Sequence, residues 1–368
     1  MTGFALYRLP HEQQVTMVAQ TEGEPLELAS CEDLNGRTGF VVAPFAVSTA
    51  TPIVLIQPDI VKTFPSVSDF VSDESNQFPW EKLSVSLGET TSSLGGNSNK
   101  TTYSDDFSRF FLHLNNGDFC KLVLSRCAEV PVTENVSPLE LYQRACQLYP
   151  RLFISLVYTP QSGMWLMATP EILLEGIDNQ WRTIALAGTM KLEGDDLQGE
   201  GENMTWSTKN IQEQRYVATY LMNCLERVAD DIREEGPRTV RAANLVHLRS
   251  DFTFTFYNNA RVGNVLQMLH PTPAVCGLPK QEAYDFILAN EHTPRLYYSG
   301  FMGPLKLPSA IHHSSPTTHL YVSLRCMQIT DNQYRLYAGG GLLKDSVEEQ
   351  EWQETEAKME TMRRVLKT

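Results

Sequence analysis

Long hydrophobic segments and paired cysteines are both missing from this 368-residue chain. No apolar run approaches the roughly 18 residues that a membrane-spanning helix needs, and the first residues, MTGFALYRLPHEQQ, lack the apolar centre of a signal peptide. The seven cysteines are scattered, odd in number and never arranged as CxxC, which disfavours a zinc site or a disulfide framework. These absences predict a reduced, cytoplasmic protein with no membrane partner.

Positive charge is scarce as well. The chain has 44 acidic against 30 basic residues, a net charge of −14, which argues against nucleic acid or an anionic membrane as a partner. A small anionic substrate is compatible with this balance, because local arginines or a metal ion can outweigh the overall field. Hydrophobic residues make up 42% of the chain, enough for a sizeable core, and the length fits one large domain or two.

The character of the chain changes near residue 106. Residues 1–60 alternate short apolar runs with turns and predict strands, whereas 88–106, rich in Ser, Thr, Asn and Gly, predicts a mobile loop or linker. Every residue with evident chemical potential lies beyond Phe107. We therefore divide the chain into a variable part, residues 1–105, packed into the same fold, and a catalytic part, residues 106–368.

Beyond that boundary the pattern predicts hairpins with helices between groups of strands. Segments 152–158 and 164–169 are separated by five residues that include a proline and a glycine, which is typical of a hairpin, and 321–329 with 334–339 predicts a second one. Further strands are expected at 120–130 and 181–189, and helices at about 137–149, 203–234 and 346–367. Paired strands with intervening helices indicate an α+β fold and not a parallel βαβ array.

The stretch 269–303 carries the densest set of unusual residues. Three prolines follow His270 within nine residues and favour a rigid loop. The stretch then becomes helical, with Glu291 and Arg295 at helical spacing. It ends on Tyr298 and two nearby glycines, which allow another backbone to approach closely. Together these features indicate a wall for an anionic ligand.

The helix predicted at 203–234 carries a carboxylate on its apolar side. Glu213 falls in line with Val217 and Leu221, and a buried carboxylate needs a partner. The alternative is an ordinary surface pair with Lys209, one turn away on the same helix.

The last predicted helix has a similar feature. Its start resembles a capping box formed by Ser346 and Glu349. Glu351, Glu354 and Lys358 fall within a narrow arc beside its apolar face; a solvated salt-bridge face is the alternative. Carboxylates from two separate helices that meet at a cleft would suit a hard cation such as Mg²⁺.

Two further residues have the character of a base and an acid. Lys121 is the only charged residue in CKLVLS and alternates with Phe119 and Val123, so its side chain can point inward, where burial can make a lysine a base. A snorkelling lysine at a strand end is the alternative. Glu171 precedes an apolar ILL run, where burial can raise the pKa of a carboxyl and make it an acid; the alternative is an ordinary strand-edge glutamate.

A glycine-rich segment completes the set of candidates. AGGGLLKDS, 338–346, lies between a strand and a helix and offers backbone N–H groups that favour an anion. Arg325, on the predicted strand 321–329, strengthens that interpretation. His247, in NLVHLRS, is typical of a core histidine, and no role is assigned to it.

These segments together resemble the chorismate-utilising enzyme family over about residues 107–366. Nine motifs occur in the family's order: KLVLSR, ATPEILLEG, IALAGT, STKNIQEQ, HPTPAVCGLP, RLYYSGFMG, SLRCMQI, AGGGLLKDS and EWQETEAK. HPTPAVCG is most similar to the isochorismate synthase branch. The resemblance implies an α+β fold of two large antiparallel sheets packed face to face, with helices outside and the site in a cleft between the sheets.

The resemblance also implies roles for individual residues. Lys121 matches the family's water-activating lysine, and Glu171 matches the acid that protonates the departing C4 hydroxyl of chorismate. Glu213 and Glu354 match Mg²⁺-binding glutamates, with Glu351 as a further candidate. The positions that match the substrate-binding side are Thr189, His270, Tyr298, Arg325, Gly339, Gly341 and Lys358.

The branch can be chosen by chemistry. Ammonia-using anthranilate synthases lack a lysine at the position of Lys121, and aminodeoxychorismate synthases carry a nucleophilic lysine where this chain has Ala187. The implied reaction therefore adds water at C2 of chorismate as the C4 hydroxyl leaves, giving isochorismate without a glutamine amidotransferase subunit. The alternatives are a salicylate synthase and a non-catalytic chorismate-binding module, although a module would need neither Lys121 nor Glu171. The product could feed menaquinone, siderophore or salicylate synthesis.

Overall fold

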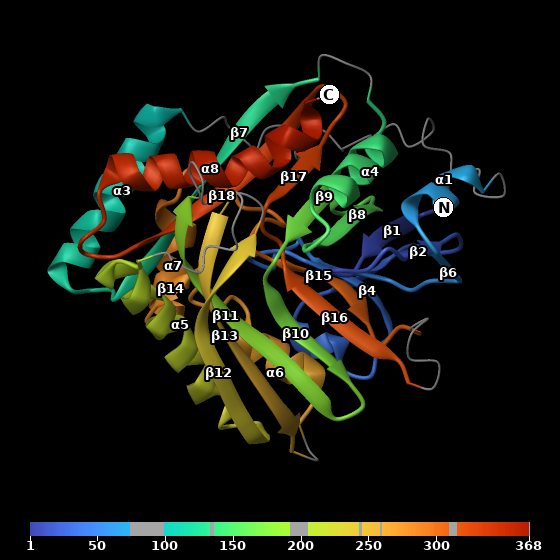
Figure 1. The fold of residues 1–368 in the computed structure, drawn as a ribbon, viewed down its shortest axis with the longest axis horizontal. Coiled ribbons are helices and arrows are strands. Elements are labelled where there is room, and N and C mark those ends of the chain that lie inside the picture. The colour runs from blue at the N-terminus through green and yellow to red at the C-terminus, as the bar shows by residue number, and fades with distance from the viewer. Residues whose placement is uncertain are drawn as a thin grey trace.

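The computed structural model describes residues 1–73, 99–132, 136–191, 205–242, 245–257, 260–308 and 315–367. Within these ranges the strands form two nine-stranded antiparallel sheets (Figure 1). The first sheet has the order β14 (Gly277–Leu278), β7 (Lys121–Pro131), β18 (Gln333–Leu342), β17 (Cys326–Ile329), β9 (Gly163–Thr169), β8 (Phe153–Thr159), β1 (Gly3–Arg8), β2 (Val15–Gln20) and β6 (Ile60–Phe64). The second has the order β12 (Ala229–Ala242), β13 (Leu245–Phe256), β11 (Gln180–Lys191), β10 (Ile172–Ile177), β16 (Thr317–Val322), β15 (Phe301–Leu305), β4 (Gly39–Ala43), β5 (Ile53–Ile56) and β3 (Leu26–Leu28).

The two sheets pack face to face, and helices cover their outer sides. Phe153 of β8 stacks on Tyr321 of β16 with ring centroids 4.3 Å apart, within a core shared by both sheets. Helices α4 (Pro138–Leu148) and α8 (Glu348–Leu366) pack on the first sheet, and α5 (Thr208–Leu225) and α6 (Val262–Leu269) pack on the second (Figure 1). Helices α3 (Lys100–Asn116) and α7 (Lys280–Asn290) pack beside β7. The predicted α+β architecture is confirmed.

The N-terminal segments are part of both sheets. Strands β1, β2 and β6 end the first sheet, and β3, β4 and β5 end the second, with the short helices η1 (Cys31–Leu34) and α1 (Val67–Ser72) between and after them. Their apolar side chains join the shared core. In the described part of the chain, no helix is both long enough and apolar enough to cross a membrane.

Both predicted hairpins are confirmed, but one predicted strand is divided. Strand β8 pairs with β9, and β17 pairs with β18. The segment 321–329, expected as one strand, instead ends β16 in the second sheet at Val322 and begins β17 in the first sheet at Cys326. Arg325 adopts a positive φ of 47° at this crossing. The division brings Arg325 between the two sheets, which local alternation does not reveal.

Three predicted boundaries are wrong. The helix expected at 203–234 ends at Leu225, because residues 229–242 form β12 and pair along β13. Helix α8 begins after Val347 without the expected capping box, since Ser346 Oγ accepts a hydrogen bond from the Leu343 N–H instead. The segment 88–106, expected as a loop, is helical from Lys100, where Asn99 caps α3; its earlier residues lie outside the described ranges.

The glycines after Tyr298 are required by close backbone contacts, as expected. A Cβ on Gly300 would lie 1.9 Å from the Ala43 carbonyl oxygen, and one on Gly303 would lie 1.9 Å from that of His319. Such distances are far inside van der Waals contact. The backbones that approach them belong to β4 and β16, so these glycines allow β15 to fit between its neighbours in the second sheet.

Candidate active site

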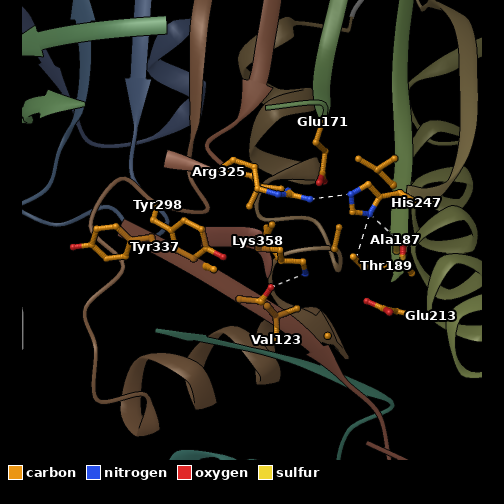
Figure 2. Close-up of a pocket in the computed structure, with 18 residues that line it drawn as sticks. Val123, Glu171, Ala187, Thr189, Glu213, His247, Tyr298, Arg325, Tyr337 and Lys358 are labelled. Carbon is orange, nitrogen blue, oxygen red and sulfur yellow. Dashed lines mark hydrogen bonds between the residues drawn. The ribbon is translucent and has the colours of Figure 1, made fainter. Parts of the chain in front are cut away.

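A polar pocket lies where the ends of several strands from the two sheets meet α5 and α8 (Figure 2). Figure 2 shows Glu171, Arg325 and Lys358 pointing into the same space, with Tyr298 and Tyr337 on one side and Glu213 on the other. Eight of the residues predicted from the sequence line this pocket: Glu171, Thr189, Glu213, Tyr298, Arg325, Gly339, Gly341 and Lys358.

Arg325 is held by a neutral histidine. Its Nη2 lies 2.9 Å from His247 Nε2, and His247 Nδ1 lies 3.2 Å from the carbonyl oxygen of Gly188 and from Thr189 Oγ1. Because a guanidinium only donates, Nε2 accepts and the ring proton is on Nδ1. Burial, and then the charges of Arg325 and Lys358, lower the pKa of His247 well below its usual value. The guanidinium therefore has an oriented partner that leaves its positive charge uncancelled.

Glu171 is a buried carboxyl directly before β10. Burial raises its pKa to about 7, although the positive charges of Arg325, Lys121 and Lys358 oppose the rise. Its backbone N–H donates to Thr169 Oγ1 at 3.2 Å, and its carbonyl oxygen accepts from the Val322 N–H at 2.9 Å. The backbone of this residue is thus fixed on both sides. The side chain can hold a proton near neutral pH, as an acid must.

Lys121 and Glu213 form a buried ion pair across two elements. Lys121, at the start of β7, is fully buried, and its Nζ lies 3.1 Å from Glu213 Oε1 on α5. Burial alone would raise the pKa of Glu213, but Lys121, Lys209 and Lys358 outweigh that effect and lower it. The inward orientation expected for both residues is confirmed. Lys209 does not pair with Glu213 within the helix, as the alternative required, but with Glu351 of α8.

The carboxylates of α8 converge over the three consecutive glycines of β18. A Cβ on Gly340 would lie 3.2 Å from Glu351 Oε2 and 3.8 Å from Glu354 Oε1. Lys358 Nζ donates to Glu354 Oε1 at 2.6 Å and to the Gly339 carbonyl oxygen at 2.7 Å. Burial, and then the neighbouring Glu354 carboxylate, raise the pKa of Glu351 to about 7. These side chains line the inner side of the helix, as its periodicity predicted.

The donor chemistry here fits a hard cation. Glu351 Oε2 is buried and has no hydrogen-bond partner within the described ranges, a costly state for a carboxylate oxygen. It faces Glu354 over Gly340, and Glu213 Oε1 would lie 2.1 Å from a Cβ on Gly341. As they stand, however, no three acidic, histidine or cysteine side chains of the described residues form a ready-made metal site. Each of the three carboxylates is instead paired with a lysine.

Two glycine amides face the pocket from β18. Val123 and Ser125 of β7 direct their N–H groups away from β18, to the Cys276 carbonyl oxygen and to Glu291. Their partners across the strand pair are Gly341 and Gly339. Two residues that face each other in an antiparallel strand pair either exchange both backbone hydrogen bonds or exchange none. The N–H groups of both glycines therefore also point away from β7, on the pocket side. The amides expected for an anion come from this strand and not from a helix terminus.

His270 lies apart from the pocket lining. Its Nε2 lies 3.1 Å from the carbonyl oxygen of Pro44, and its ring packs edge-on against Phe301. Burial, and then the charge of Lys280, lower its pKa to about 4, so the ring is neutral and Nε2 donates. This position does not support the predicted substrate contact of His270.

Sequence reasoning missed two polar side chains of the pocket. His247 was given no role, although a histidine within the otherwise apolar run Leu245–Leu248 is a signal that could have singled it out. Tyr337 stacks on Tyr298 with ring centroids 5.5 Å apart and carries no sequence signal beyond its strand. Both depend on contacts between segments that are distant in the chain.

Comparisons with known proteins show what this chain is similar to. Residues 68–367 match the model of the family described as chorismate binding enzyme. The isochorismate synthase MenF of Escherichia coli K12 is 31% identical over 252 residues, which cover 68% of this chain and 56% of MenF. The isochorismate synthase EntC of the same organism is 27% identical over 245 residues, covering 66% of this chain and 61% of EntC.

A solved structure shows the same fold. The structure of MenF, the menaquinone-specific isochorismate synthase from Escherichia coli, superposes with a TM-score of 0.77 at 22% identity, over 99% of this chain and 89% of that chain. In the sequence matches, by contrast, the chain spans less than two thirds of the length of MenF and EntC.

The raised pKa of Glu171 makes a prediction about stability. Its pKa of about 7 in the folded chain exceeds the ordinary 4.5, so the stability it contributes is fully present below 4.5 and is lost as pH rises through 7. The free energy of unfolding of Glu171→Gln, minus that of wild type, should therefore be larger at high pH than at low pH. The increase should be up to about 3 kcal/mol. Urea unfolding between about pH 4 and pH 8 measures this difference. A pH-independent difference would contradict the burial effect.

Proposed function

We propose that this chain, which belongs to the family of chorismate-binding enzymes, converts chorismate to isochorismate. The observation that carries the proposal is the meeting of a buried lysine and a protonatable glutamate at one cationic pocket. Lys121 is fully buried beside Glu213 of the pocket wall, and Glu171 lines the pocket. The two groups are close enough that the positive charge of Lys121 opposes the rise in the pKa of Glu171. A module that only bound its ligand would need neither group.

The pocket suits a dicarboxylate. Arg325 and Lys358 supply positive charge, and the amides of Gly339 and Gly341 supply oriented donors of the kind that bind carboxylates. Tyr298 adds a hydroxyl beside the same strand, since a Cβ on Gly339 would lie 2.8 Å from its oxygen. Chorismate carries one carboxylate on its ring and one on its enolpyruvyl group, so both could be met by groups of this pocket.

Acid and base roles follow from the environments of the two groups. Glu171, protonated near neutral pH, donates its proton to the C4 hydroxyl, which leaves as water. Lys121 accepts a proton from the water that adds at C2, so the ring exchanges one C–O bond for another. Lys121 Nζ lies 3.1 Å from Glu213 Oε1, so the lysine is free to meet a water molecule only when Glu213 has another partner. Ala187 presents a methyl group to the pocket, which favours water over an amine side chain as nucleophile.

The carboxylates identify which residues would hold Mg²⁺. Glu213 and Glu354 are the proposed ligands, and the free Oε2 of Glu351 is a third donor. When bound, the ion would supply a fixed positive charge that binds a carboxylate and stabilises developing negative charge. Lys121 and Lys358, which now pair with two of these carboxylates, would keep their places beside the substrate.

The product identifies the activity. We expect purified protein with chorismate and Mg²⁺ to form isochorismate, detected by chromatography, and to approach a mixture of both compounds because the bonds exchanged are alike. Salicylate accumulating as fast as chorismate disappears would place the chain among enzymes that also eliminate pyruvate. Binding of chorismate without turnover would indicate the non-catalytic module.

Removing the acid or the base should abolish most of the activity. Lys121→Ala and Glu171→Gln should each lower turnover by about 10²–10⁴-fold in both reaction directions, because the two groups exchange roles in reverse. Glu175→Gln is the matched control: this buried carboxylate lies outside the pocket lining, bonded to His319 and Tyr321, and its loss should leave the turnover of folded protein unchanged. More than about a tenth of wild-type turnover in Lys121→Ala would refute the base role.

Metal binding can be tested apart from activity. Calorimetric titration of Mg²⁺ in the presence of chorismate should show binding to the wild type and its loss in Glu354→Gln, which removes a ligand charge. Glu360→Gln, on the same helix but paired with Arg364 and Lys367, should bind like the wild type. Equal binding by both variants would exclude Glu354 as a ligand.

A further inference from the structure

One buried ion pair lies behind the pocket wall and is not used by the proposed chemistry. The side chains of Glu291 and Arg295 are each only 3% exposed. Arg295 Nε donates to Glu291 Oε2 at 2.6 Å, and Nη2 donates to Oε1 at 2.8 Å. The guanidinium also lies over the ring of Phe45, 4.2 Å from its centroid. Sequence spacing predicted the pairing, but α7 ends at Asn290 and Glu291 is its C-cap residue, so the pair joins the end of the helix to the segment that follows it.

The pair takes the place of a missing strand beside β7. Strand β14 pairs only with Lys121 and Leu122 of that edge. Further along, Arg295 Nη2 donates to the Val123 carbonyl oxygen at 2.7 Å, and Glu291 Oε1 accepts from the Ser125 N–H at 2.7 Å. Buried backbone groups need such partners. Two side chains therefore complete the sheet edge where the strand partner ends.

The same arginine reaches two more parts of the pocket wall. Nη1 donates to the carbonyl oxygen of Val275 at 2.6 Å, which fastens the proline-rich loop. The backbone carbonyl oxygen of Arg295 accepts from the Tyr298 N–H at 2.9 Å. Val123, Val275 and Tyr298 all line the pocket. One residue thus connects three separate segments of the wall, each through a main-chain group.

We propose that Glu291 and Arg295 are positioning residues, which set the spacing of the pocket wall for substrate without touching it. The proposal rests on the proposed function, because the substrate used to test it is chorismate. The pair is internally neutral, so it acts through geometry and adds no net charge to the pocket. Small displacements of a binding wall are costly, since rates fall by on the order of 100-fold for a shift of about 1 Å.

The decisive variant is Arg295→Lys, which keeps the charge but cannot make the four side-chain hydrogen bonds at once. Arg8→Lys is the matched control. Arg8 is a buried arginine that also donates to main-chain carbonyl groups, those of Cys146, Tyr149 and Leu152, but on α4 and the segment after it, outside the pocket lining. Both variants should lower the melting temperature. Kinetics are measured well below it, on protein shown by circular dichroism to be folded.

We expect Arg295→Lys to lower kcat/KM for chorismate by about 10- to 100-fold, mainly through KM, with the pH–rate profile unchanged. Glu291→Gln, which keeps an oxygen for Ser125 but weakens the hold on Arg295, should show a smaller loss in the same direction. Arg8→Lys should keep the wild-type kcat/KM. Equal kcat/KM in the Arg295 and Arg8 variants would overturn the positioning role and leave the pair a purely structural one.

Binding separates this inference from the proposed activity. If wild type binds chorismate but does not convert it, the proposed activity fails, and calorimetry still tests the pair: weaker binding by Arg295→Lys than by Arg8→Lys supports it, and equal binding refutes it. If Arg295→Lys does not fold, Glu291→Gln decides in its place. Wild-type protein that neither binds nor converts chorismate overturns both proposals.

Discussion

Buried charge must find opposite charge, and the joining of the first sheet to α5 at the pocket depends on this constraint. Lys121 is fully buried on the first sheet, and its partner Glu213 lies on the helix that packs against the second. Leaving either one unpaired would cost several kcal/mol, by the usual penalty for breaking a buried pair. The register of β7 and the position of α5 are therefore coupled through one contact. Lys209 adds a second link of the same kind, from α5 to Glu351 on α8.

These pairs leave the pocket with a definite charge. Three lysines pair with three carboxyl groups, of which Glu351 also has a pKa raised to about 7, and His247 is neutral, so Glu351 and Glu171 decide how much positive charge remains near neutral pH. With Glu171 protonated below about pH 7, the arginine is left as excess positive charge. A chain of net charge −14 can in this way present a cationic pocket to an anionic ligand.

The backbone contributes as much as the side chains. At Arg325 the chain crosses from one sheet to the other with a positive φ, which brings the guanidinium between them. At Gly339 and Gly341, β18 turns its amides toward the pocket, and Gly340 and Gly341 leave room for the carboxylates of α8 and α5. A side chain at Gly341 would collide with Glu213. The site therefore needs glycine at these positions of β18 because a side chain would not fit there, and not only because the backbone amides face the pocket.

The sequence by itself determined what depends on neighbours along the chain. Alternation and helical spacing correctly predicted the hairpins and offered the inward Lys121 and the inward carboxylates of α8 as one of two alternatives each, because these are local properties of one element. Only the tertiary structure decided the division of 321–329 between two sheets, the strand at 229–242 and the choice of Glu351 as the partner of Lys209. These depend on pairing between segments far apart in the chain, where burial and hydrogen bonding outweigh local preference.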